Sequence, residues 1–204
     1  MAIIKESSDE LNPPVALTPA VIARAPQRRT PRDKLALAVA TCGVGYLPLA
    51  PGTWGSAVGL GLYLLLRVAS AGVFARAVTR GWSVPQLESL RVTLMLLMLI
   101  LITIAGIWAA SRAESLMGRK DPGAVVIDEV VGQLMTFLFV PFSAGLWAIV
   151  AGFLAFRVFD IWKPYPIRRL EALESGLGIM ADDVLAGAYA ATILSLLTSL
   201  HLLL

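Results

Sequence analysis

The sequence predicts an all-α, polytopic membrane protein with about four to five apolar helices, whose acidic residues cluster at their cytoplasmic ends. Of its 204 residues, 57% are hydrophobic and 15% are charged, whereas a soluble domain carries about 25% charged residues. The mean hydropathy of +0.77 agrees with a chain that has lipid as part of its solvent. Five acids stand at the ends of apolar segments, where a carboxylate is costly unless a cation, a basic side chain or water offsets it.

Five apolar segments follow a polar N-terminal stretch. Residues 1–32 are polar and broken by prolines, without the apolar core of a signal peptide, and we expect a flexible cytoplasmic tail before one membrane domain over residues 33–204. The clearest segment has about 19 uncharged residues, close to what a bilayer-spanning helix needs, and some of the others are short enough to require tilt or partial insertion. In chain order the segments are 53–66, 92–110, 125–140, 144–162 and 181–204.

The distribution of basic residues indicates how the chain is oriented in the membrane. If the N-terminus is cytoplasmic and each segment crosses once, 13 Lys and Arg residues lie inside and 4 lie outside, in agreement with the positive-inside rule. The same threading puts the five acids on the cytoplasmic side. We expect membrane lipids as partners and no nucleic acid, and the sequence carries no signal for the oligomeric state. The five acids are Asp128, Glu129, Asp160, Asp182 and Asp183.

The stretch 43–56, which leads into the first segment, is rich in glycine and proline. Pro51 excludes a regular helix through that position, and we expect a helix that starts with Thr53 as its N-cap. The unpaired N–H groups of such a start bind anions, which would make the stretch a phosphate cradle. A tight loop whose glycines allow close packing explains the same composition, and the sequence leaves both interpretations open.

Two acidic pairs share one layout, in which a pair opens an apolar helix and a glycine follows one of its acids by four residues. Asp128 and Glu129 precede Gly132, and Asp182 and Asp183, expected in the first turn of the last helix, precede a glycine at position 187. A glycine one turn beyond an acid lies on the same face and lets another helix or a headgroup approach. Oxygen ligands from several segments suit Mg²⁺, or Mn²⁺ in its place, rather than zinc. Acids that complement a helix dipole are the structural alternative.

The fourth segment ends with charged residues of both signs. Arg157 and Asp160 are three residues apart and share a helix face, so they form either a structural ion pair or part of a phosphate-handling set. Pro164 disfavours helix at Lys163, and we expect the chain to turn there. Lys163 would then lie near the membrane surface.

Four motifs occur in a fixed order along the chain. They are Gly45-x-x-Pro48-x-x-Pro51-Gly52-Thr53-x-Gly55-Ser56, Asp128-Glu129-x-x-Gly132, Phe156-Arg157-x-x-Asp160-x-x-Lys163-Pro164-x-Pro166-Ile167 and Gly178-Ile179-Met180-x-Asp182-Asp183-x-x-Ala186-Gly187. Together they resemble the phosphatidylglycerophosphatase A family. The resemblance implies a largely helical, Mg²⁺-dependent membrane phosphatase that hydrolyses phosphatidylglycerophosphate to phosphatidylglycerol and phosphate. It also implies a bacterial inner membrane, with the active site facing the cytoplasm.

Phosphatase mechanisms that use a cysteine or histidine nucleophile do not fit this sequence. Cys42 lacks the arginine spacing of cysteine phosphatases, and the only histidine, His201, lies near the C-terminus. Metal-assisted attack by water remains. Our hypothesis takes Glu129 as the catalytic base or a further ligand, with Asp128 and Asp160 as the other catalytic residues. The expected metal ligands are Asp128, Asp160, Asp182 and Asp183, and the expected phosphate-binding residues are Thr53, Ser56, Arg157 and Lys163.

Two other functions use carboxylates in membranes. A CDP-alcohol phosphatidyltransferase also employs aspartates and Mg²⁺, but its long pattern of Asp, Gly, Ala and Arg within one segment does not occur here. A small transporter or channel would use the acids as a cation site near the bilayer midplane, whereas these acids stand at segment ends. Release of phosphate, release of CMP and transport into vesicles are the assays that separate the three.

Overall fold

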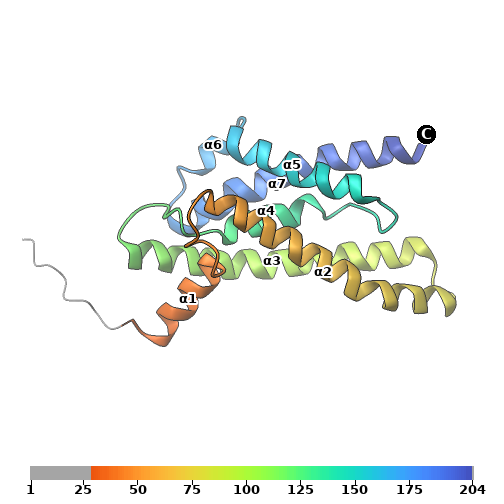
Figure 1. Cartoon of the computed structure of the whole chain (residues 1–204), viewed down its shortest axis with the longest axis horizontal. Helices are drawn as coiled ribbons and strands as arrows, with labels where there is room; N and C mark the ends of the chain where they lie inside the picture. The colour runs from red at the N-terminus through yellow and green to blue at the C-terminus, as the bar shows by residue number, and fades with distance from the viewer. Residues whose placement is uncertain (1–28, 204) are drawn as a thin grey trace, which may run out of the picture.

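The computed structural model describes residues 29–203, and every regular element in that range is a helix (Figure 1). The predicted all-α class is confirmed. Of the expected tail, residues 1–28 lie outside the described range, and Pro31 already begins the first helix. The helices are α1 (Pro31–Thr41), α2 (Pro51–Thr79), α3 (Val84–Met117), α4 (Ile127–Thr136), α5 (Leu146–Trp162), α6 (Ile167–Leu170) and α7 (Ser175–Leu203).

Three of the described helices, α2, α3 and α7, are long and apolar enough to cross a membrane. Helix α5 has 17 residues and is about 26 Å long, a little less than the ~30 Å hydrocarbon core of a bilayer. Helix α4 has 10 residues, or about 15 Å, and cannot span a bilayer alone. The expectation that residues 125–140 form a membrane-crossing helix is therefore wrong, because the helix ends at Thr136 and turns connect it to α5.

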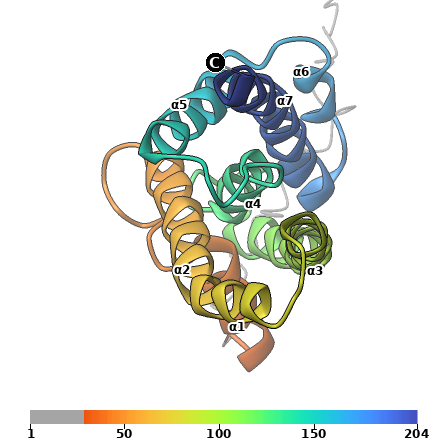
Figure 2. The same ribbon diagram turned by 90° about the vertical axis from the view of Figure 1, so that its right-hand side faces the viewer.

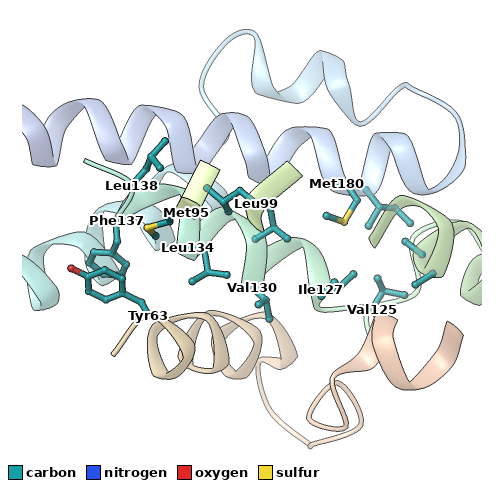
Figure 3. Packing of buried hydrophobic residues seen from close by; sticks show 14 of the residues in the cluster. Tyr63, Met95, Leu99, Val125, Ile127, Val130, Leu134, Phe137, Leu138 and Met180 are labelled. Carbon is teal, nitrogen blue, oxygen red and sulfur yellow. The ribbon is translucent and has the colours of Figure 1, made fainter. Parts of the chain in front are cut away.

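Helix α4 lies at the centre of the bundle, with α2, α3, α5 and α7 around it (Figure 2). Its apolar side chains Val130 and Leu134 are buried, and they form part of a core that α2, α3 and α7 also supply (Figure 3). At the end of α4, the Phe137 ring stacks on that of Tyr63 from α2 with 4.3 Å between centroids. An enclosed helix can carry polar groups because protein, rather than lipid, surrounds them.

Helices α4 and α7 cross at two glycines. A Cβ atom added at Gly187 would collide with the backbone of Gly132, and one added at Gly132 would lie 2.6 Å from the carbonyl oxygen of Asp183. This confirms the expectation that a glycine one turn beyond Asp128 lets another helix approach. The crossing brings the turns that carry Asp128 and Asp183 together.

Helix α7 begins earlier than expected. It starts at Ser175, so Asp182 and Asp183 lie two turns inside the helix, and the expectation of acids in the first turn is wrong. The two glycines that suggested a turn, Gly176 and Gly178, are positions where neighbouring backbone packs closely against α7. A Cβ atom on Gly176 would collide with the backbone of α3 at Ile107, and the Gly176 N–H donates a hydrogen bond to Ser111 Oγ at 3.1 Å.

The helix ends nearest the five acids lie at one end of the bundle, which we call the acidic end. Helices α2, α4 and α7 start there, whereas α3 and α5 finish there (Figure 1). The α2–α3 connection, the turns between α4 and α5 and the C-terminus of α7 lie at the opposite end. The short connections and alternating directions therefore gather distant parts of the chain at one site.

Candidate active site

Asp128, Glu129 and Asp183 form a group of three carboxylates. Each offers one oxygen, and the three oxygens lie within 4.8 Å of one another. Asp128 and Asp183 are buried, and Glu129 is half-buried. The first turn of α4 supplies two of the three acids, and α7 supplies the third at the glycine crossing. Oxygens this close to one another can share a single cation.

Unpaired oxygens indicate what this site would bind. Asp128 Oδ1, Glu129 Oε2 and Asp182 Oδ1 are buried and have no hydrogen-bond partner in the described structure. Buried carboxylate oxygens normally have partners, and leaving them unpaired is costly. The charges of Asp160, Glu129 and Asp182 also act on Asp183, which adds repulsion between like charges. A divalent cation would relieve both penalties, and the all-oxygen donor set fits Mg²⁺.

Arg157 connects two helices beside these carboxylates. It forms an ion pair with Asp160 on α5, and its Nη1 atom also donates a hydrogen bond to Ser56 Oγ at 3.4 Å. Ser56 Oγ donates in turn to the Gly52 carbonyl oxygen at 2.9 Å. A Cβ atom added at Gly52 would collide with Glu129. The first turn of α2 and the positive charge of Arg157 therefore border the carboxylate group.

The start of α2 differs from the sequence prediction. The N-cap is Ala50 in a left-handed conformation (φ 48°), and Pro51 is the first helical residue. Proline is favoured at this first position because the N–H that it lacks would be unpaired there in any case. The expectation of Thr53 as N-cap is therefore wrong. Thr53 lies in the first turn with its side chain exposed, whereas Ser56 is fully buried.

Lys163 holds two acidic side chains together at the end of α5. It ends the helix in a left-handed conformation (φ 46°), which confirms the turn expected before Pro164. Lys163 Nζ lies 2.6 Å from Asp182 Oδ2 and 2.6 Å from Glu171 Oε1. Partial burial lowers the pKa of the Lys163 ammonium, but its hydrogen bonds to the two carboxylates outweigh burial and raise the pKa overall. Lys163 therefore keeps its positive charge at neutral pH.

Replacing Lys163 with Met should destabilise the protein by about 2 kcal/mol, because the buried carboxylate of Asp182 loses its cation. Unfolding in a graded detergent series measures the change. Lys120→Met is the matched control, since the exposed Lys120 reaches only the carbonyl oxygen of Glu171, at 3.3 Å. It should shift stability by less than about 0.5 kcal/mol. Wild-type stability of the Lys163→Met protein would contradict a stabilising ion pair.

The predicted site residues fall into two sets. Asp128, Glu129 and Asp183 meet directly, whereas Asp160 and Asp182, also predicted as metal ligands, lie at the edge of the group in ion pairs with Arg157 and Lys163. Burial raises the pKa of the Cys42 thiol, and the Glu129 charge raises it further. Such a thiol is a poor nucleophile at neutral pH, in agreement with the exclusion of cysteine chemistry.

Sequence reasoning did not single out Gln133 or Glu171. Gln133 is fully buried one turn beyond Glu129, and neither its amide oxygen nor its nitrogen has a partner in the described structure. The signal for Gln133 was an amide within an apolar run, the same kind of signal that selected the acids. Glu171 lies in an exposed stretch between α6 and α7, and nothing in its local sequence marks it as a partner of Lys163.

Comparisons with known proteins identify a phosphatase family. The family model described as Phosphatidylglycerophosphatase A matches residues 37–198. A Bacteroides thetaiotaomicron protein named "Putative phosphatidylinositol-3-phosphatase" is 39% identical over 153 residues, which cover 72% of this chain and 83% of the relative. The "Phosphatidylglycerophosphatase A" of Haemophilus influenzae is 38% identical, covering 72% of this chain and 78% of the relative. That of Escherichia coli is 33% identical, covering 74% and 76%.

No solved structure matches the chain. The family match spans most of the described helices and includes every residue of the carboxylate group. The resemblance seen in the four sequence motifs is thereby confirmed. The chain is a phosphatase with three described helices long and apolar enough to cross a membrane, and it belongs to the phosphatidylglycerophosphatase A family.

Proposed function

We propose that this protein hydrolyses phosphatidylglycerophosphate to phosphatidylglycerol and inorganic phosphate, with Mg²⁺ as its cofactor. The observation that carries the proposal is the group formed by Asp128, Glu129 and Asp183, with its unpaired buried oxygens, in a chain of this family. The substrate is a lipid with a terminal phosphate monoester. A site at the ends of apolar helices suits such a substrate because its acyl chains stay in the bilayer while its headgroup reaches the surface.

The carboxylates have distinct proposed roles. Asp128 and Asp183, with Asp160 and Asp182 beside them, would hold Mg²⁺. When bound, Mg²⁺ would polarise the phosphate and lower the pKa of a water molecule. Glu129 is our candidate for the base that takes the proton from the attacking water, because its Oε2 atom is buried without a partner. Glu129 as a further metal ligand is compatible with the same geometry.

Basic groups at the edge of the site would offset the charge of the phosphate. Arg157 borders the carboxylates through Asp160, and Lys163 does so through Asp182. Fixed positive charges near a phosphoryl group stabilise the charge that develops on it during transfer. The N–H groups of Thr53 and Trp54 already donate to the Ala50 carbonyl oxygen, at 2.9 and 3.4 Å, and Pro51 has no N–H, so the expected set of unpaired donors at this helix start is not present. The exposed Thr53 side chain would contact the phosphate instead, whereas the buried Ser56 would act by holding Arg157.

We further propose that the acidic end faces the cytoplasm from the inner membrane of a bacterium. The excess of basic residues on the same side as the acids supports this orientation. The named relatives are bacterial proteins. Helix α4 starts at the acidic end and α5 returns to it. The chain therefore still runs from the acidic end to the opposite end and back between α3 and α7, as this orientation requires, even though α4 is short.

Phosphate release from phosphatidylglycerophosphate by the purified protein in mixed micelles tests the proposal. We expect release with Mg²⁺, a fall of at least about 100-fold in excess EDTA and recovery when Mg²⁺ is restored, because the water nucleophile depends on the cation. Unchanged activity in EDTA would refute the metal role. Absence of phosphate release under all conditions would refute the reaction itself, and release of CMP from a CDP-lipid would indicate a transferase.

A phosphoinositide is the second candidate substrate, because one relative is named for activity on phosphatidylinositol 3-phosphate. Both substrates are lipid phosphate monoesters, which the carboxylate group would treat alike. The difference between them lies in the headgroup. The ratio of kcat/KM for the two lipids decides the question, and a ratio of about tenfold or more in favour of the phosphoinositide would move the proposal to that lipid.

A further inference from the structure

A recess lies between α2 and α3, away from the acidic end. Its volume is about 270 Å³, and most of its wall is apolar. The side chains of Tyr63 and Phe74 from α2, Leu94 and Met98 from α3, and Phe142 after α4 contribute to this wall. We call it the α2–α3 groove. Apolar walls of this kind accommodate a hydrocarbon chain.

One basic side chain stands in this apolar wall. Arg67 Nη2 donates hydrogen bonds to the carbonyl oxygens of Phe142 at 2.9 Å and Ala144 at 2.7 Å. The Arg67 Nη1 atom is buried and has no hydrogen-bond partner in the described structure. The guanidinium carbon also lies 6.0 Å from the centre of the Phe142 ring. Two carbonyls and a ring hold the guanidinium group in place, and one of its nitrogens is left without an acceptor from the protein.

The charge of Arg67 is not neutralised by a neighbour. Arg91, the other basic residue of the groove, pairs with Glu88 at 2.6 Å. Glu88 also accepts a hydrogen bond from the Phe142 N–H at 2.9 Å, so both of its oxygens are engaged. No salt bridge to Arg67 occurs among the described residues. The groove therefore has one positive charge in excess, beside a hydrocarbon-lined wall.

The position along the bundle gives the depth of this charge. Arg67 is about 22 Å from Gly52 along α2, at the rise of an α-helix. If the acidic end lies at one membrane surface, Arg67 lies about 8 Å short of the far edge of a ~30 Å hydrocarbon core. Arginine at that depth reaches toward the nearer headgroups. Its natural acceptor there is the phosphate of a lipid, which guanidinium groups bind well.

We propose that the α2–α3 groove binds one anionic phospholipid from the leaflet opposite the acidic end. The phosphate would lie beside the Arg67 guanidinium group and be attracted by its charge, and an acyl chain would lie against Tyr63, Leu94 and Met98. The net charge of the groove favours a lipid with a net negative charge over a zwitterionic one. The inference depends on the membrane placement of the bundle and is independent of the reaction at the carboxylates.

Photo-crosslinking in reconstituted bilayers tests the groove. Two phospholipids carry the same photoreactive acyl chain, one with an anionic glycerol headgroup and one with choline, and the labelled peptides are identified by mass spectrometry. The anionic lipid should label residues 63–74 and 87–98 about fivefold more than the choline lipid, the effect of about 1 kcal/mol from one basic residue near the surface. Equal labelling by the two lipids in wild-type protein would overturn the proposal, because the groove would then face bulk lipid without selection.

Three variants distinguish lipid binding by Arg67 from a purely structural role of this residue. Arg67→Gln should abolish the headgroup preference, whereas Arg67→Lys, which keeps the charge but loses the fork, should retain most of it. Arg76→Gln removes an exposed arginine from the same helix outside the groove, and it should leave the preference unchanged. A preference that survives Arg67→Gln would assign Arg67 solely to holding the turn at 142–144. The wild-type headgroup comparison remains decisive if Arg67→Gln does not fold.

Discussion

An Asp183→Asn protein is expected to lose at least about 100-fold of its lipid-phosphatase turnover, since a metal ligand and its charge are removed. It should also become more stable than the wild type in EDTA. Asp183 is buried beside Asp128 and Glu129, and without a cation these like charges repel one another. Phosphate release and thermal unfolding, each with Mg²⁺ and with EDTA, measure the two effects. Loss of activity combined with a gain of metal-free stability is the signature of a cation site.

Two controls make this result specific. Asp128→Asn should behave as Asp183→Asn does, whereas Asp121→Asn, an exposed acid outside the group, should keep both activity and stability. The wild type should gain thermal stability on addition of Mg²⁺, as a ligand that binds only the folded state requires, and Asp183→Asn should lose that gain. Near-normal turnover in both the Asp128→Asn and the Asp183→Asn proteins would show that the site lies elsewhere.

The Gly187→Ala substitution is expected to cost about 2 kcal/mol of stability, the usual effect of overpacking. The new methyl group would collide with the backbone of Gly132, and no side-chain rotation can relieve a clash between a Cβ atom and a main chain. We also expect at least a tenfold loss of turnover, because a displacement of about 1 Å at a catalytic group can cost up to about 100-fold. Detergent unfolding and phosphate release measure the two losses.

Gly61→Ala is the matched control for this substitution. Gly61 lies within α2, and a Cβ atom there would meet nothing within 4 Å. Alanine is a better helix former than glycine by about 1 kcal/mol, so this variant should be as stable as the wild type or more stable, with normal activity. If Gly187→Ala matched Gly61→Ala in both measurements, the close contact of α4 with α7 would not be what sets the carboxylate geometry.

The gathering of acids at one end of the bundle could be predicted from the sequence for a physical reason. A carboxylate next to hydrocarbon needs compensation, and the positive-inside count puts Asp128 and Asp183 on one side of the membrane. The repeated spacing from each of these acids to a glycine also indicated where two helices touch. Neither inference required knowledge of the fold. Each depends on a local free-energy cost, that of an uncompensated carboxylate or of a side chain between two touching helices, which any fold of this chain must avoid.

The depth and length of α4 could not be predicted in the same way. Residues 125–140 carry only two charged side chains in an otherwise mostly apolar run, and apolar composition does not distinguish burial by protein from burial by lipid. The beginnings of α2 and α7 were misjudged because Pro51 and Gly176 were interpreted as breaks. In the structure, Pro51 is the first helical residue of α2, and Gly176 lies in the first turn of α7, where α3 packs closely.

The central position of α4 has a consequence for biosynthesis. Two of the helices that enclose it, α2 and α3, precede it in the chain, whereas α5 and α7 follow it. Until α7 has been translated, a segment with two carboxylates and an amide lacks part of its protein cover, and lipid is a poor substitute. The carboxylate group proposed as the active site is therefore among the last parts of the molecule to be enclosed. A nascent chain that ends before α7 would expose the α4 segment to quality control.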